Sequence, residues 1–316
     1  MILCCGEALI DMIPDTSTNG DACFVPKAGG ALFNTSIALG RLGADVGLFT
    51  GVSTDLFGAL LEKELLASGV STAFLFKSNA PSTLAFVELK DGHAAYTFYS
   101  KNTADTSLTT TDIPANLNGV DALLFGGISL CTEPTASTML AMMQKYANNH
   151  VIMLDPNIRT AFIKDEEKYR NRLGKMIALT DILKISDEDL NWLVPDTSSI
   201  EKQIDVLIGD SSKLVLVTKG SDGAVAFHGP NEIAVVAATK VIVADTIGAG
   251  DTFNAGILQS LVNDRALTKP FHANPDQNTI QTALRHANKI AAMTVSRIGA
   301  KPPMAFRDLT LPLSGI

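Results

Sequence analysis

The stretch "VIVADTIGAGDTFNAG" (residues 241–256) decides the fold that the sequence predicts. Its β-branched first half is typical of a buried strand, and the apolar spacing after Asp251 is typical of a helix. We therefore expect Gly248, Ala249 and Gly250 to form a loop between a strand and a helix. The N–H groups and the dipole of a helix N-terminus bind anions at such a junction, above all phosphate.

Asp251 places a carboxylate where an anion is expected, so it would repel a bound phosphate. A dinucleotide-binding loop does not explain the stretch, because Phe253 stands at its third glycine, and the Gly-Lys-Ser/Thr of a Walker A loop is missing. A phosphotransferase site explains both the glycine loop and the acid. The N–H groups would stabilise the transferring phosphoryl group while Asp251 accepts the proton of the attacking hydroxyl. We expect the helix dipole to keep the pKa of Asp251 low. An Asp that only caps the helix is the alternative.

Composition narrows the class of protein. The 316 residues are 46% hydrophobic and 18% charged, and the formal net charge is −8, which argues against nucleic acid or an anionic membrane as the main partner. Four cysteines, Cys4, Cys5, Cys23 and Cys131, lack metal-ligand or redox spacing. The N-terminus lacks a basic leader, and no apolar run approaches the roughly 18 residues of a membrane helix. We expect a cytoplasmic protein.

Short apolar runs alternate with longer amphipathic segments along much of the chain. Helices are expected from Pro134 to about residue 149 and from Ser186 to just before Pro195. This alternation predicts a doubly wound α/β fold, a mostly parallel sheet with helices on both faces and ligands at the carboxyl ends of the strands. Besides 241–246, the expected strands are 121–130, 150–155, 181–186 and 213–220.

A different pattern occupies residues 82–100, where side-chain character alternates around a "DG" turn at residues 91–92. This indicates an antiparallel hairpin. With residues 23–31 it predicts a small inserted antiparallel β lid, formed by about 14–30 and 70–105, on a single domain that spans 1–316. The small sheet could close over a ligand or join two copies into a homodimer.

Two motifs resemble a known family. "DTIGAGDTFNAG" (245–256) and "AGGALFNTSIALGRLG" (28–43) resemble the C-terminal and N-terminal signatures of the ribokinase-like, or PfkB, carbohydrate kinases, and bacterial fructokinases are the most similar by eye. The resemblance runs over essentially the whole chain. It implies a ribokinase-like fold and a sugar kinase that uses ATP and Mg²⁺, with K⁺ as an open question.

The sugar site that the resemblance implies is drawn from several motifs. Asp11, expected at the end of the first strand, can accept hydrogen bonds from paired hydroxyls; a surface Asp before a turn is the alternative. Asn34 offers a donor and an acceptor, but it could also cap a helix. Arg159 suits substrate or phosphate, unless it forms a structural pair with an Asp. The implied sugar-binding residues are Asp11, Gly29, Gly30, Asn34, Phe98, Lys101 and Arg159.

The motif "KISDEDL" (184–190) occupies the family's N-x-x-E position, but Ser186 and Asp189 replace both of its ends. Asp189 or Glu188 could act on Mg²⁺ through its waters, and a Ser-capped acidic first turn explains the same letters without a metal. The resemblance implies that Asp245, the Ile247 carbonyl and Ser296 hold a monovalent cation. The implied ATP-binding residues are Lys184, Ser186, Thr218, Gly220, Gly223 and Asn288.

Ser100 bears on the choice of sugar: the resemblance implies a basic residue at this position in the 2-keto-3-deoxygluconate kinases and in many fructokinases, and its absence here weakens the case for an acidic sugar, although Lys101 and Arg159 remain. A neutral sugar, D-fructose first, is therefore the expected acceptor, with Asp251 as general base and the backbone of Gly248 to Gly250 as anion hole. A 2-keto-3-deoxygluconate kinase, a ribokinase or a nucleoside kinase are alternatives within the family. A catalytically silent sugar-binding regulator and, disfavoured by Phe253, an NAD-dependent oxidoreductase are alternatives from other classes.

Overall fold

The computed structural model describes residues 1–90, 93–195, 199–209, 211–297 and 299–300. Its centre is a nine-stranded sheet in which every neighbouring pair is parallel except β11 with β12 and β12 with β13. The expected mostly parallel sheet is confirmed. In spatial order the strands are β13 (Asn231–Val236), β12 (Ala224–His228), β11 (Leu214–Thr218), β10 (Ile182–Ser186), β9 (Val151–Asp155), β8 (Ala122–Gly126), β1 (Ile2–Cys5), β4 (Val46–Ser53) and β5 (Leu75–Ser78).

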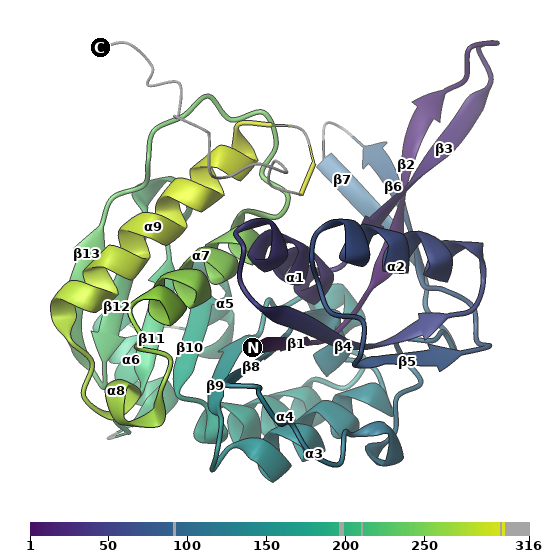
Figure 1. Cartoon of the computed structure of the whole chain (residues 1–316). Coiled ribbons are helices and arrows are strands. Elements are labelled where there is room, and N and C mark those ends of the chain that lie inside the picture. Colours follow the sequence, from purple (N-terminus) through teal and green to yellow (C-terminus); the bar gives the residue numbers. More distant parts are fainter. Residues whose placement is uncertain (91–92, 196–198, 210, 298, 301–316) are drawn as a thin grey trace.

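Helices cover both faces of this sheet, because successive strand residues point to opposite faces and both sets are apolar. In β1, Ile2 and Cys4 belong to one buried cluster, whereas Leu3 and Cys5 belong to the other. The first cluster is covered by α1 (Ala31–Arg41), α2 (Leu56–Ala67), α7 (Ala249–Asn263), α8 (Lys269–Ala273) and α9 (Gln277–Val295), and the second by α3 (Thr135–Tyr146), α4 (Glu166–Leu179), α5 (Asp187–Leu193) and α6 (Ile200–Ile208) (Figure 1).

The order of strands reverses at β1, which lies between β4 and β8. In a doubly wound sheet, ligands bind outside the carboxyl ends of the strands at such a switch point. Cys5 ends β1 and Gly126 ends β8 at this place, and Asp155 and Ser186 end the next two strands along the same edge. The fold therefore directs attention to this edge.

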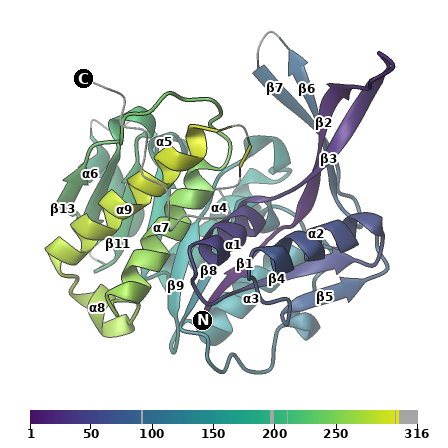
Figure 2. The same cartoon turned by 45° about the horizontal axis from the view of Figure 1, so that its top comes forward.

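A second, four-stranded sheet stands beside the large one and projects from it (Figure 2). Its order is β3 (Ala22–Gly29), β2 (Leu9–Thr16), β6 (Leu84–Lys90) and β7 (His93–Tyr99), antiparallel except between β2 and β6. The expected hairpin is present, although its turn at 91–92 lies outside the described residues. The expected span of the lid was wrong in two respects: the small sheet starts at Leu9, and β5 pairs with β4 in the large sheet.

The strand expected over residues 241–246 is absent, although the segment is rich in β-branched residues. Ile242 is 85% exposed, and the N–H groups of Ala244 and Asp245 donate to the Val295 carbonyl at the end of α9, at 2.8 and 3.2 Å. The segment bonds the end of α9 and has no recorded pairing with β13, the edge strand of the large sheet. The tertiary contacts of this segment therefore override its local preference for a strand. The chain therefore enters α7 from a loop that packs on α9.

The other expected elements agree with the structure in kind and differ at their ends. Helix α3 has Pro134 at its N-cap, and α5 ends before Pro195. The run 121–130 is divided: β8 ends at Gly126, and a 3-10 helix, η2 (Gly127–Leu130), follows. No helix among the described residues is long and apolar enough to cross a membrane.

Candidate active site

Helix α7 begins at the expected glycine loop. Gly248 is its N-cap in the left-handed region, with φ of 79°, and a Cβ there would lie 2.5 Å from the Ala300 carbonyl oxygen, so only glycine fits. The N–H groups of Gly248, Gly250 and Asp251 have no hydrogen-bond acceptor within the described part of the chain, and that of Ala249 reaches the Thr246 oxygen at 3.4 Å. This helix start offers open donors to an anion.

The carboxylate of Asp251 lies in the first turn of α7, and the residue is only 8% exposed. Its Oδ2 accepts a hydrogen bond from Asn34 Nδ2 of α1 at 3.0 Å, and its carbonyl oxygen accepts one from Thr35 Oγ1 at 3.1 Å. The two capping alternatives are wrong for these residues: among the recorded contacts, neither side chain bonds an N–H of its own helix. Instead, the two motifs meet through these side chains.

Burial raises the pKa of Asp251 to about 7. The Asn34 hydrogen bond lowers this pKa, the charge of Asp155 raises it, and the ammonium of Lys184 lowers it. The expectation that the helix dipole holds the pKa low is therefore wrong, because loss of water around a buried carboxylate outweighs the dipole. A carboxyl group that titrates near neutral pH suits a general base.

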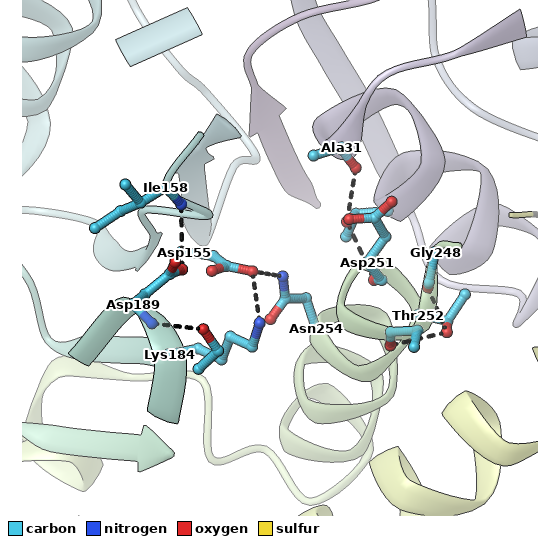
Figure 3. A network of polar contacts seen from close by, with 12 residues as sticks. Ala31, Asp155, Ile158, Lys184, Asp189, Gly248, Asp251, Thr252 and Asn254 are labelled. Carbon is cyan, nitrogen blue, oxygen red and sulfur yellow. Dashed lines mark hydrogen bonds and ion pairs between the residues drawn. The ribbon is translucent and has the colours of Figure 1, made fainter. Parts of the chain in front are cut away.

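A second polar cluster lies one turn further along α7. Lys184 Nζ donates to Asp155 Oδ2 at 3.0 Å, and Asn254 Nδ2 donates to the same oxygen at 2.6 Å. The three side chains come from β10, β9 and α7, and Figure 3 shows them converging. Each of the three residues is at most 5% exposed.

Three buried oxygens around these clusters have no hydrogen-bond partner among the described residues: Asn34 Oδ1, Asp155 Oδ1 and Asn254 Oδ1. Buried polar atoms are almost always paired, so a group of unpaired acceptors indicates that a ligand or water supplies donors. Sequence reasoning missed Asn254, although its spacing of three residues from Asp251 places both on neighbouring positions of one helix.

Sequence reasoning also missed Glu7, which holds the start of α1. The residue is 3% exposed, its Oε1 accepts from the Ala31 N–H at 2.9 Å, and its Oε2 accepts from the Ser129 N–H at 3.3 Å. Gly30, the N-cap of α1, has φ of 109° and no side chain to cap the helix, so Glu7 supplies that acceptor from a distance. A carboxylate directly after the first apolar strand was the available signal.

Asp11 lies inside β2 and not at the end of the first strand, which corrects the expected position. A Cβ at Gly29 would lie 2.2 Å from Asp11 Oδ2, so the carboxylate rests against the backbone of β3. Phe98 of β7 packs against Phe162 with ring centroids 4.3 Å apart. This contact joins the small sheet to the 3-10 helix η3 (Thr160–Phe162) beyond β9.

Lys101 and Arg159 are both exposed. Arg159 Nη1 donates to the neighbouring Ile158 carbonyl at 3.1 Å, and the structural Arg–Asp pair considered as an alternative is not found among the described ion pairs. A cavity lies between the base of the small sheet and η2. It is lined by Ser100, Asp105, Thr106, Ile128, Ser129, Thr132, Thr135 and Phe162.

The candidate nucleotide residues follow the same edge of the large sheet. Thr218 ends β11, and Gly220 and Gly223 flank the next turn, both with positive φ. Asn288 of α9 donates from Nδ2 to the carbonyls of Val236 and Ala237 at 3.3 and 3.1 Å, so it ties α9 to the chain after β13.

The start of α5 has the Ser-capped form considered as an alternative to a metal site. Ser186 Oγ accepts from the Asp189 N–H at 3.0 Å, and Asp189 Oδ2 accepts from the Ile158 N–H at 3.1 Å. Burial raises the pKa of Asp189, and the charge of Asp155 adds to this. Glu188 is exposed. A group of three or more His, Cys, Asp or Glu residues suited to a metal is not found among the described residues.

The residues suggested for a monovalent cation lie where the loop before α7 meets the end of α9. The Asp245 carboxylate accepts from the N–H groups of Ile247 and Gly299 at 3.0 and 2.9 Å. Ser296, the C-cap of α9, donates from Oγ to the Met293 carbonyl at 3.0 Å. Asp245 and Ser296 are thus brought close together, since the Asp245 N–H bonds the residue before Ser296.

Open N–H groups at a helix start, a buried carboxylate in its first turn and a buried ammonium beside it are the groups that phosphoryl transfer to an alcohol requires. The fold and the site thus define an α/β phosphotransferase. The sequence model that describes the pfkB family of carbohydrate kinases matches residues 1–306 of this chain. The chain belongs to this family.

Known proteins resemble this chain along nearly its whole length. A fructokinase from Rhizobium leguminosarum bv. trifolii is 42% identical over 95% of this chain and 94% of its own. The structure of a Xylella fastidiosa fructokinase with bound ATP is similar with a TM-score of 0.85 at 28% identity, covering 95% of this chain and 94% of the other. A Vibrio cholerae O395 fructokinase double mutant with fructose, ADP and potassium bound has a TM-score of 0.82 at 28% identity, with coverages of 96% and 94%.

Proposed function

We propose that this carbohydrate kinase transfers the terminal phosphoryl group of ATP to a hydroxyl of D-fructose. The observation that carries the proposal is the buried Asp251 carboxylate beside the open N–H groups of α7. The choice of ATP and fructose is supported by the fructokinases that the chain resembles, of which one was seen with ATP and another with fructose.

The chemistry follows from the positions of these groups. Asp251 accepts the proton of the attacking hydroxyl, and Asn34 fixes the orientation of its carboxylate through the 3.0 Å hydrogen bond. The N–H groups of Gly248 and Gly250 donate to oxygens of the transferring phosphoryl group, where negative charge is spread in the transition state. The donors are fixed by the helix, so they need no rearrangement when the charge develops.

The sugar in this proposal lies at the base of the small sheet, with Asp11, Gly29, Gly30 and Asn34 on one side and Phe98 on the other. Asp11 Oδ2 lies against Gly29, and Phe98 packs on Phe162 of the large-sheet side. Movement of the small sheet would then cover the sugar and exclude water from the phosphoryl group. Ser100 beside the cavity offers a hydroxyl in place of a cation, which favours a neutral sugar over an acidic one.

The ATP in this proposal lies along the carboxyl edge of β10 and β11, against Ser186, Thr218, Gly220, Gly223 and Asn288. Mg²⁺ prefers oxygen ligands, keeps most of its waters and is held largely by phosphates. The few carboxylates near the start of α5 suit an ion that needs only one or two oxygen ligands from the protein. Asp189 lies close enough to Asp155 and Lys184 for both charges to shift its pKa. When bound with ATP, Mg²⁺ neutralises phosphate charge. A K⁺ site at Asp245, Ile247 and Ser296 is supported by the potassium in the Vibrio cholerae enzyme.

We also infer a homodimer through the small sheet and a cytoplasmic location. Phe24, Phe86 and Tyr99 stack edge to face on that sheet, and Phe24 and Tyr99 are 46% and 62% exposed. Exposed aromatic rings on a projecting sheet favour contact with another copy. All four thiols are free, as thiols remain in a reducing compartment.

A sugar panel tests the proposed acceptor. With ATP and Mg²⁺, ADP release is expected to be fastest with D-fructose, because the relatives reported above are fructokinases. It should be much slower with ribose or a nucleoside, and slower still with 2-keto-3-deoxygluconate, because Ser100 beside the cavity has no charge to pair with a carboxylate. The same assay without Mg²⁺ is the control. Turnover confined to an acidic sugar would contradict the choice of fructose, and sugar binding without any ADP release would indicate a regulator.

The pH dependence of kcat/KM tests Asp251 as the base. Its pKa of about 7 in the free enzyme predicts that kcat/KM is high above pH 7 and falls as the pH drops, because the protonated carboxyl cannot accept a proton. Asn34→Ala removes a hydrogen bond that favours the charged form, so the fall should begin at higher pH. A profile that is flat from pH 5 to 8, or that is unchanged in Asn34→Ala, would contradict the assignment.

A further inference from the structure

Lys184 occupies a position where the sheet otherwise carries apolar side chains. It is the third residue of β10 and pairs in register with Leu216 of β11, on the face that α7 covers. Ile182, two residues earlier on the same face, belongs to the apolar cluster there. Lys184 is 5% exposed, so its ammonium has lost nearly all of its water. Burying a charge in this way is costly unless partners replace the water.

The ammonium has one recorded acceptor, Asp155 Oδ2, so two of its three N–H donors have no acceptor in the described part of the chain. Asn254 Nδ2 donates to the same oxygen at 2.6 Å, so Lys184 shares the acceptor that the described residues provide. The other oxygen, Asp155 Oδ1, and the amide oxygen of Asn254 are both buried without a partner. This cluster therefore has hydrogen-bond donors and acceptors that find no partner among the described residues.

The place of the ammonium is defined by Gly250. A Cβ built on Gly250 would lie 3.2 Å from Lys184 Nζ, so the ammonium rests against the first turn of α7. The open N–H groups of this turn, together with the positive end of the α7 dipole, face the same space as the ammonium. Two positive groups that face one buried space repel each other until an anion arrives. The carboxylates of Asp155, which accepts from the ammonium, and of Asp251, whose pKa the ammonium lowers, offset this repulsion only in part.

We propose that Lys184 is a further catalytic residue, whose ammonium contacts the transferring phosphoryl group opposite the N–H groups of α7. Asp155 and Asn254 are positioning residues that hold the ammonium at this place. The proposal rests on ATP as the phosphoryl donor in the proposed function. A fixed ammonium in a site without water stabilises the negative charge on the phosphoryl oxygens. Because the ammonium is already in place, it does not have to rearrange when the bond to the leaving group breaks.

A purely structural ion pair is the competing explanation. Buried pairs of this kind contribute little net stability compared with apolar residues of similar volume, so stability gives no reason for a lysine among Ile and Leu side chains. The structure contains a suitable comparison: Lys269 Nζ pairs with Asp181 Oδ2 at 2.6 Å at the opposite edge of the same sheet, just before β10 begins. That pair is far from α7's first turn and serves as the matched control.

Binding of ATP and ADP to Lys184→Met, measured by calorimetry without sugar, is the first test. ADP lacks the phosphoryl group that Lys184 contacts in the proposal. The variant should therefore bind a non-hydrolysable ATP analogue about tenfold or more weakly and ADP within about twofold of the unmodified protein. Lys184→Arg, which keeps the charge, should retain part of the preference for the ATP analogue. Lys269→Met should change neither affinity.

Turnover gives the second test. Lys184→Met should lower kcat by about 10²-fold or more and leave the KM of the sugar within about threefold, because the lost contact forms with phosphoryl oxygens in the transition state. Asp155→Asn should lower kcat in the same way, and the double variant should lose little more than Lys184→Met alone, since both changes remove one function. Additive losses would contradict the positioning role.

Two results would overturn the proposal: equal weakening of ATP-analogue and ADP binding in folded Lys184→Met, or a kcat within about threefold of the unmodified protein. The binding test requires no acceptor sugar. If fructose proves to be the wrong sugar, the proposed function fails in the sugar panel, while the comparison of ATP analogue with ADP still decides the role of Lys184.

Discussion

Asp251→Asn is expected to lower kcat about 10²- to 10⁴-fold, the range that a positioned general base contributes. The amide has nearly the shape of the carboxylate and can still accept the Asn34 hydrogen bond, so the fold and ATP binding should persist. What is lost is the acceptor for the hydroxyl proton. The measurement is ADP release at saturating sugar and ATP, together with ATP binding by calorimetry.

Asp264→Asn is the matched control for this substitution. Asp264 is the exposed C-cap of the same helix, at the end away from the open N–H groups. Its neutralisation should leave kcat unchanged. If Asp251→Asn keeps more than about a third of the turnover, Asp251 is not the base, and the acid limb of the pH profile must come from another group.

Gly248→Ala is expected to lower kcat about 10²- to 10³-fold, comparable with the loss of one donor from an oxyanion hole. The N-cap of α7 has φ of 79°, and the new Cβ would lie 2.5 Å from the Ala300 carbonyl oxygen. Alanine there strains the backbone and pushes the loop away from its neighbour, at a cost of order 1–3 kcal/mol in unfolding free energy. The first turn of α7 then no longer presents its N–H groups in the same directions.

Gly174→Ala separates this effect from the loss of any glycine. Gly174 is exposed within α4, and nothing lies within 4 Å of the position of its Cβ. Alanine has the higher helix propensity, so this variant should gain about 0.5–1 kcal/mol in unfolding free energy and keep full turnover. Denaturant unfolding and ADP release are measured on both variants. Full turnover in Gly248→Ala would contradict the anion hole at this loop.

Much of the site could be predicted because its residues lie in continuous motifs, in which neighbouring residues by themselves determine the local structure. The glycine loop, the helix that follows it and the family signatures are all contained in 245–256 and 28–43. Residues 241–246 were wrongly predicted as a strand, because their β-branched side chains express only a local preference. The hydrogen bonds that this segment makes to the end of α9 depend on the tertiary structure. Asp11 was misplaced for a related reason: the chain leaves the large sheet at Cys5 and starts the small one at Leu9.

The sequence by itself determined the class of fold, the helix start at Gly248 and the identity of the acid beside it, since these follow from spacing and from the special backbone of glycine. Only the tertiary structure decided the chemical state of that acid. Burial and the charge of Asp155 raise its pKa to about 7, against the lowering effect of Asn34 and Lys184, and Asp155 and Lys184 stand almost 100 and almost 70 residues away along the chain. Desolvation and long-range charge depend on which surfaces meet, so no local pattern around Asp251 contains them.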